Sequence, residues 1–61
     1  MNELFQVIEF SENSNYHNAV VNMTKLLNDG YEVIEQYDVR YGTLIVLRKF
    51  VEWKDYLYLI N

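Results

Sequence analysis

Apolar and polar residues follow one another in blocks along this chain, and each block has the spacing of one kind of secondary structure. Residues 4–10 are rich in β-branched and aromatic side chains, which is typical of a strand. Between residues 16 and 27, apolar side chains recur every three or four positions, which predicts a helix. Residues 31–39 alternate and residues 43–50 are mostly apolar, so both segments predict strands. The predicted order is therefore strand, helix, strand, strand.

Both ends of the predicted helix carry local signals. The polar segment 11–15 indicates a loop that ends in a helix N-cap. At the other end, Gly30 follows Asn28-Asp29 and suits the left-handed residue just beyond a helix, with Tyr31 as the apolar residue that packs back on the last turn. These signals predict a helix that stops shortly before residue 30.

The turn between the last two strands sets their predicted register. Arg40-Tyr41-Gly42 predicts a three-residue loop, with its glycine at the position that favours positive φ. This loop would pair Val39 with Thr43 and Glu35 with Leu47. We therefore expect Glu35 to reach Lys49 diagonally as a cross-strand ion pair. Simple alternation places three polar residues on one solvated, acidic face of this strand: Glu32, Gln36 and Asp38.

These elements favour an α+β fold, with a single domain over residues 1–61. The first and third strands are apolar on both faces, and a right-handed crossover makes the first two strands parallel. A β-α-β-β fold with strand order 1-3-2 satisfies both conditions. One helix covers one face of such a sheet, so the opposite face needs another cover. The apolar residues expected there are Ile34, Leu44, Val46 and Phe50.

The aromatic C-terminal tail, residues 51–61, is the candidate cover. Its apolar spacing fits a short helix or extended arm as well as a fourth strand, so both remain open. Aromatic residues are enriched at protein interfaces. We therefore predict an oligomer or partner interface that combines the tail with the uncovered face, formed by Phe5, Ile34, Leu44, Val46, Phe50, Trp53, Tyr56, Leu57, Tyr58 and Ile60.

Composition narrows the classes of protein that the chain can represent. It has 61 residues, no cysteine and one histidine, so neither disulfides nor a structural zinc site is expected to stabilise so short a chain. Unusually dense apolar packing or association with another chain must then supply the stability, and the uncovered apolar face of the sheet favours a homo-oligomer. The net charge of −4 disfavours nucleic-acid binding. No apolar run reaches the length of a membrane span, and the acidic N-terminus does not resemble a signal peptide. We expect a cytoplasmic protein without a membrane partner.

Three segments together resemble a known group of small domains: residues 5–9, 26–33 and 43–49. The first reads Phe-Gln-Val-Ile-Glu, the second ends in Gly-Tyr-Glu-Val, and the third is an apolar strand that closes on Arg-Lys. In this they are similar to small bacterial and phage βαββ domains of unknown function. The resemblance covers residues 4–49 and leaves the aromatic tail outside. Its motifs are structural, so it implies the fold and no activity.

Catalytic chemistry finds little support in the residue types. His17 has no cysteine to activate and sits among asparagines, so we expect a solvated side chain and no enzyme, metal or cofactor. Most of the basic residues fall between positions 40 and 54. In an oligomer, arginines beside tyrosines can form an anion or nucleotide pocket at a subunit interface. The residues that would form it are Arg40, Tyr41, Arg48 and Lys49.

The function expected from these features is that of a non-enzymatic, homo-oligomeric binding module. A small acidic chain of this kind is similar in general character to the inhibitors that phages and mobile elements direct against host or defence proteins. Two alternatives remain. The first is a binder or sponge for small ligands such as signalling nucleotides, with pockets at subunit interfaces. The second is an accessory structural subunit of a larger complex.

Overall fold

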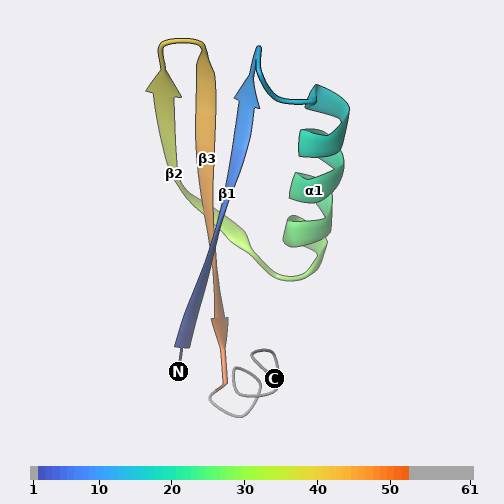
Figure 1. Ribbon diagram of the computed structural model, residues 1–61. Helices are drawn as coiled ribbons and strands as arrows, with labels where there is room; N and C mark the ends of the chain where they lie inside the picture. Colours follow the sequence, from blue (N-terminus) through green and yellow to red (C-terminus); the bar gives the residue numbers. More distant parts are fainter. Residues whose placement is uncertain (1, 53–61) are drawn as a thin grey trace.

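The computed structural model describes residues 2–52, which form one helix and three strands. These are β1 (Asn2–Ser11), α1 (Tyr16–Asn28), β2 (Glu32–Val39) and β3 (Gly42–Val51). Strand β3 lies between β1 and β2 and is antiparallel to both (Figure 1). The predicted α+β fold, element order and strand order 1-3-2 are thus confirmed. The predictions for the tail beyond residue 52 lie outside the described residues.

Both helix ends form as the sequence predicts. Asn15 is the N-cap, and its side chain accepts a hydrogen bond from the Asn18 N–H at 3.1 Å. At the C-terminus Gly30 has a φ of 97°, which a residue without Cβ adopts at little cost. The Tyr31 N–H then donates to the Leu26 carbonyl at 3.0 Å, and the Gly30 N–H donates to the Leu27 carbonyl at 3.2 Å. This pair of bonds is the Schellman arrangement, and it satisfies carbonyls that the helix end would otherwise leave free.

The hairpin between β2 and β3 differs from the prediction. Its loop has two residues, Arg40 and Tyr41, and Val39 pairs with Gly42 instead of Thr43. No residue of this loop has a positive φ, and neither does Gly42. The glycine serves close packing instead, because a Cβ there would collide with the Phe10 carbonyl oxygen and approach the Ser11 Cβ to 2.6 Å. The shorter loop shifts the register by one residue.

A β-bulge at Ile34 shifts the register again. Val33 pairs with Leu47, whereas Glu35 pairs with Val46, so Ile34 is the extra residue between two regular stretches. Because side chains alternate along a strand, the bulge exchanges the faces on which the residues before and after it lie. The expected row of Glu32, Gln36 and Asp38 is therefore wrong: Glu32 is opposite Arg48 and Asp38 is opposite Thr43, on different faces.

The predicted ion pair between Glu35 and Lys49 is also wrong. Lys49 projects from the opposite face of β3 and binds Asp29 at the end of α1, with 3.2 Å between Nζ and Oδ2. Its ammonium also lies 5.7 Å from the centre of the Tyr31 ring. The shift of register thus moved the lysine's partner from the neighbouring strand to the helix C-terminus.

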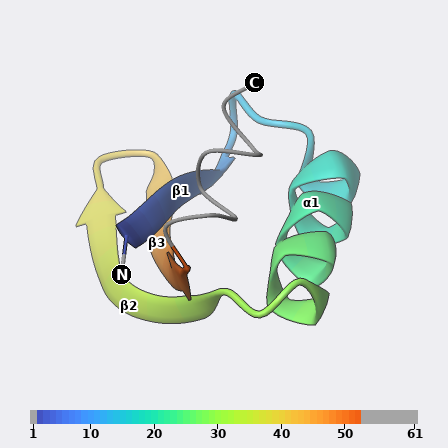
Figure 2. The same ribbon diagram turned by 90° about the horizontal axis from the view of Figure 1, so that it is seen from below.

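The buried apolar residues lie on the side of the sheet that faces α1. Phe10 marks this side, because its ring lies 5.8 Å from the Tyr16 ring of the helix. Leu47 projects to the same side and is fully buried. Seen along the strands, α1 stands beside β1 (Figure 2). The buried apolar residues among those described are Ala19, Tyr31, Leu47 and Val51.

Candidate functional site

The sheet face opposite α1 is apolar and largely exposed, and we call it the open face. Directly paired residues share a face, so the register places Phe5, Val7 and Glu9 there with Arg48, Val46 and Leu44 of the central strand. No helix or strand within residues 2–52 covers it. Four large side chains of this face are 46–57% exposed: Phe5, Val7, Tyr37 and Phe50.

Acidic residues surround the apolar centre of the open face. The register places four glutamates on it and one arginine, an excess of three negative charges. The arginine, Arg48, binds Glu32 through Nη2 at 3.0 Å and lies 4.7 Å from the centre of the Phe50 ring. Its Nε is buried and has no hydrogen-bond partner within the described part of the chain. The glutamates of the open face are Glu3, Glu9, Glu32 and Glu35.

The predicted interface residues fall into three groups. Phe5, Leu44, Val46 and Phe50 lie on the open face, as the alternation of the strands indicates. Ile34 does not join their ladder, because it is the extra residue of the bulge. The remaining residues are outside the described part: Trp53, Tyr56, Leu57, Tyr58 and Ile60.

Two of the four exposed apolar residues of the open face were not predicted to lie there. Val7 shares the face of Phe5 two positions earlier, so alternation along β1 would have identified it. Tyr37 reaches the face only because of the observed register, which pairs it with Leu44. No local signal in the sequence distinguished that register from the predicted one.

The predicted anion-binding residues do not come together in one chain. Arg40 and Tyr41 form the hairpin loop, whereas Arg48 lies six residues beyond Gly42, about 20 Å along the strand. Lys49 projects to the other face and is bound to Asp29. Arg48 itself is bound to Glu32. The geometry of residues 2–52 therefore offers no shared phosphate site to these four side chains.

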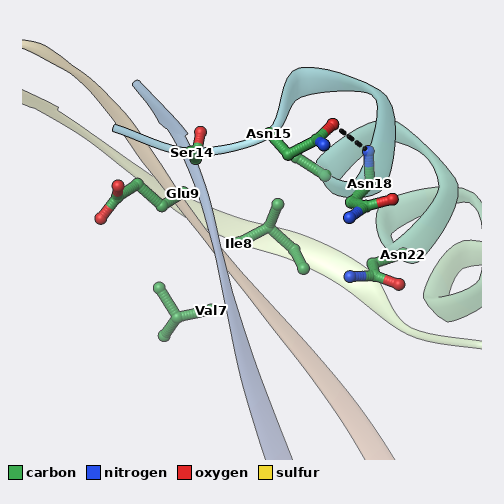
Figure 3. Close-up of a pocket in the computed structure, with 8 residues that line it drawn as sticks. Val7, Ile8, Glu9, Ser14, Asn15, Asn18 and Asn22 are labelled. Carbon is green, nitrogen blue, oxygen red and sulfur yellow. Dashed lines mark hydrogen bonds between the residues drawn. The ribbon is translucent and has the colours of Figure 1, made fainter. Parts of the chain in front are cut away.

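A groove runs between β1 and α1 (Figure 3). It consists of two cavities of about 300 and 380 Å³, which share Val7, Ile8 and Asn22 in their walls and are therefore continuous. Four consecutive residues of β1, from Gln6 to Glu9, form one wall. The helix forms the other wall, chiefly with Asn18, Ala19, Asn22, Lys25 and Leu26.

Asparagine side chains line the helical wall at the spacing of one helix face. Asn15, Asn18 and Asn22 follow one another at three and four residues, so they form a row along α1. Figure 3 shows the Ile8 side chain between β1 and this row. The side-chain amides of Asn18 and Asn22 make no hydrogen bond to another described residue. No feature of the sequence indicated that Asn18 and Asn22 border a groove.

The residue types with catalytic or ligand-binding chemistry are dispersed. His17 is exposed on the first turn of α1. Within residues 2–52, no three histidine or acidic side chains are grouped so that they could hold a metal ion. The same part of the chain contains no helix of the length and apolar character that a membrane crossing requires.

Comparisons with protein-family models, with curated proteins and with solved structures found no significant match to this chain. The two surfaces described above, the open face and the groove beside β1, are thus the features from which a function can be argued.

Proposed function

We propose that this protein is a binding module whose open face docks on a basic surface of another protein. The observation that carries this proposal is the group of four large apolar side chains, Phe5, Val7, Tyr37 and Phe50, that stand about half exposed on one face. Contiguous apolar surface of this kind is costly to leave in water and commonly marks an interaction site.

The area of the open face requires a docked partner to contact its acidic rim as well as its apolar centre. The rim consists of the four glutamates of this face, Glu3, Glu9, Glu32 and Glu35. Three strands about 4.8 Å apart and eight to ten residues long, at about 3.3 Å per residue, give roughly 450 Å². A stable protein interface covers about 800 Å² on each partner. A partner must therefore cover the whole open face, including its glutamates, and also some of the surface around it.

The charge of the rim selects the kind of partner. The open face carries four glutamates and one arginine, and that arginine is already bound to Glu32. A second copy of this chain would bring the same excess of negative charge, and like charges across an interface are unfavourable. A partner with an apolar patch flanked by lysine or arginine would complement the face. This favours a different protein over self-association through this face.

A small acidic module that covers a basic patch fits the role of an inhibitor. It would act by occupying a surface that the partner, a host or defence protein in our proposal, uses for its own contacts. Aromatic residues such as Phe5, Tyr37 and Phe50 are among the side chains that dominate the affinity of such contacts.

A photo-crosslinking experiment tests the proposal. A benzoylphenylalanine is placed at position 37, on the open face, or at position 41, an equally exposed tyrosine in the hairpin loop. In the source cells we expect an adduct with a different protein from position 37 and none from position 41. The same adduct from both positions, an adduct only with a second copy of this chain, or no adduct from position 37 would contradict the proposal.

The adduct is then verified with purified proteins. Calorimetry should show that Tyr37→Ser and Phe50→Ser each weaken binding of the identified partner at least tenfold, whereas Tyr41→Ser changes it by less than twofold. Binding should also weaken as salt is added, because the rim contacts are charged. Equal effects of Tyr37→Ser and Tyr41→Ser would exclude the open face as the docking surface.

A further inference from the structure

We propose that the groove between β1 and α1 binds an extended peptide, which joins the sheet as a strand beside β1. The groove shares Val7 and Glu9 with the open face, but neither Tyr37 nor Phe50, the docking residues tested above, lines it. The inference rests on three features of the groove: an unpaired strand edge, a row of side-chain amides across from that edge, and opposite charges at its two ends.

The first feature is the outer edge of β1. Within residues 2–52, β1 has a neighbouring strand on one side only, because the sheet order is β1-β3-β2. On the other side, every second residue of an edge strand directs its N–H and C=O outward. Residues 6–9 of this edge form a wall of the groove. An extended peptide would find there the backbone partners that a fourth strand requires.

The second feature is the amide row on α1. A strand added beside β1 would itself have an outer edge, and that edge would face Asn18 and Asn22 across the groove. A primary amide offers two donors and one acceptor oxygen, so it can bind both the N–H and the C=O of a peptide. The groove thus supplies hydrogen-bond partners to both edges of a bound strand, which a purely apolar groove would not.

The third feature is the charge at the two ends of the groove. Glu9 borders the end near the start of α1, and Lys25 borders the other end. Lys25 forms no ion pair with another residue in the range 2–52. Antiparallel pairing with β1 is slightly more stable than parallel pairing and would run the peptide from the Glu9 end to the Lys25 end. The fitting peptide therefore carries a basic residue in its N-terminal half and an acidic residue in its C-terminal half.

The groove also limits the length of the peptide. From Asn15 to Lys25 the helix rises about 15 Å at about 1.5 Å per residue. At about 3.3 Å per residue, an extended peptide crosses this distance with roughly five residues. A short linear segment is thus sufficient, and its specificity would come from side chains at alternate positions.

The probe is a display library of random eight-residue peptides selected against the full chain. Enriched peptides are synthesised, and their affinity is measured for the wild type, Asn22→Trp, Asn22→Ala and His17→Trp. Asn22→Trp fills the groove and should weaken binding at least tenfold. Asn22→Ala removes one amide and should weaken it about threefold to tenfold. His17→Trp places the same bulk on an exposed part of the helix outside the groove and should leave the affinity unchanged.

Backbone pairing has two readouts that simple occupation of the groove would not produce. N-methylation of the peptide N–H groups that point to β1 should abolish binding, whereas N-methylation of those that point to the asparagines should weaken it by no more than about tenfold. Hydrogen exchange of the outward-facing amides of residues 6–9 should slow when the peptide is bound, while that of the paired amides should not change. Three outcomes would overturn the inference. The selection enriches no peptide, the peptide binds Asn22→Trp and His17→Trp equally well, or hydrogen exchange of the β1 amides stays unchanged on binding. Tyr37→Ser should not alter peptide binding, so this test and the docking test can fail independently.

Discussion

The two sides of the central strand β3 have opposite roles. On the side of α1, Leu47 is fully buried, and Lys49 binds both the Asp29 carboxylate and the face of the Tyr31 ring. On the open face, the neighbouring Arg48 and Phe50 contact each other, and Phe50 is 46% exposed. All the buried apolar residues within the described part belong to the first side. One face thus stabilises the fold, whereas the other retains apolar surface that no element within residues 2–52 covers.

The largest effect on the free energy of unfolding is expected when substitutions are compared at two adjacent residues of β3 that project to opposite sides. Leu47→Ala should lower the free energy of unfolding by about 2–5 kcal/mol, because it leaves a cavity in the buried side. Val46→Ala, on the half-buried open face, should cost only about 1 kcal/mol. Urea denaturation of both variants measures the difference. Equal losses would show that the open face is covered in solution.

In so short a chain, the loss of unfolding free energy expected for Leu47→Ala is comparable to the total stability of the fold. A single core of this size seldom contributes more than about 3–5 kcal/mol. We therefore expect Leu47→Ala to be substantially unfolded at room temperature, which circular dichroism would show directly. A fully folded Leu47→Ala variant would mean that stability comes from contacts beyond residues 2–52.

A smaller effect on stability should appear at Gly42, which pairs with Ser11 at the end of the β1–β3 ladder. Gly42→Ala should cost about 1–3 kcal/mol, because its Cβ would collide with the Phe10 carbonyl and with Ser11. Gly30→Ala is the control: its Cβ would have ordinary space, with Lys49 Cε at 3.8 Å, and only the positive φ opposes it, at about 1–2 kcal/mol.

The location of the damage separates the two glycine variants. Hydrogen exchange should accelerate at the end of the β1–β3 ladder in Gly42→Ala and at the C-terminus of α1 in Gly30→Ala. In addition, Gly30→Asn should recover part of the loss, because asparagine tolerates the left-handed region better than alanine, whereas Gly42→Asn should not. Recovery by Gly42→Asn would argue against a steric role for this glycine.

The smallest effects are expected from the two ion pairs, one on each side of β3. Arg48 binds Glu32 on the open face, and Lys49 binds Asp29 beside α1. Both acids are more than 60% exposed, so each double-mutant cycle with glutamine or asparagine should give a coupling energy of only about 0.2–1 kcal/mol. Both coupling energies should fall in 0.5 M salt, because the screening length there is less than half of its value of about 10 Å at 0.1 M. A coupling that resists salt would mark a pair shielded from solvent, which is the outcome to expect if a partner covers Arg48.

Short-range signals explain how much of the fold was predictable. Apolar spacing determined the element types, and the asparagine N-cap and the glycine after Asp29 determined where the helix begins and ends. The two-sided apolar pattern of β1 and β3, together with the right-handed crossover between β1 and β2, was enough to place β3 at the centre of the sheet. These features depend on residues within one or two turns, or on the composition of a whole strand.

The candidate site was predictable only in part. Phe5, Leu44, Val46 and Phe50 follow from alternation within a strand, which needs no knowledge of register. Two placements depend on the register of β2, which the two-residue loop and the bulge at Ile34 determine. They are the position of Tyr37 on the open face and the location of Glu32 and Asp38 on different faces. Similarly, the row of Asn18 and Asn22 is visible in the sequence, but its position across from the edge of β1 is not.

The sequence by itself therefore determined the elements, their order along the chain and in the sheet, and an excess of apolar surface over what one helix can cover. The tertiary structure decided which residues of β2 share a face with the central strand, and which polar side of the helix borders a groove. The physical reason is the two-residue period of a strand: a shift of one residue moves every side chain to the other face. Such a shift is governed by packing across strands, as at Gly42 and Ser11, and not by the residues of the turn alone.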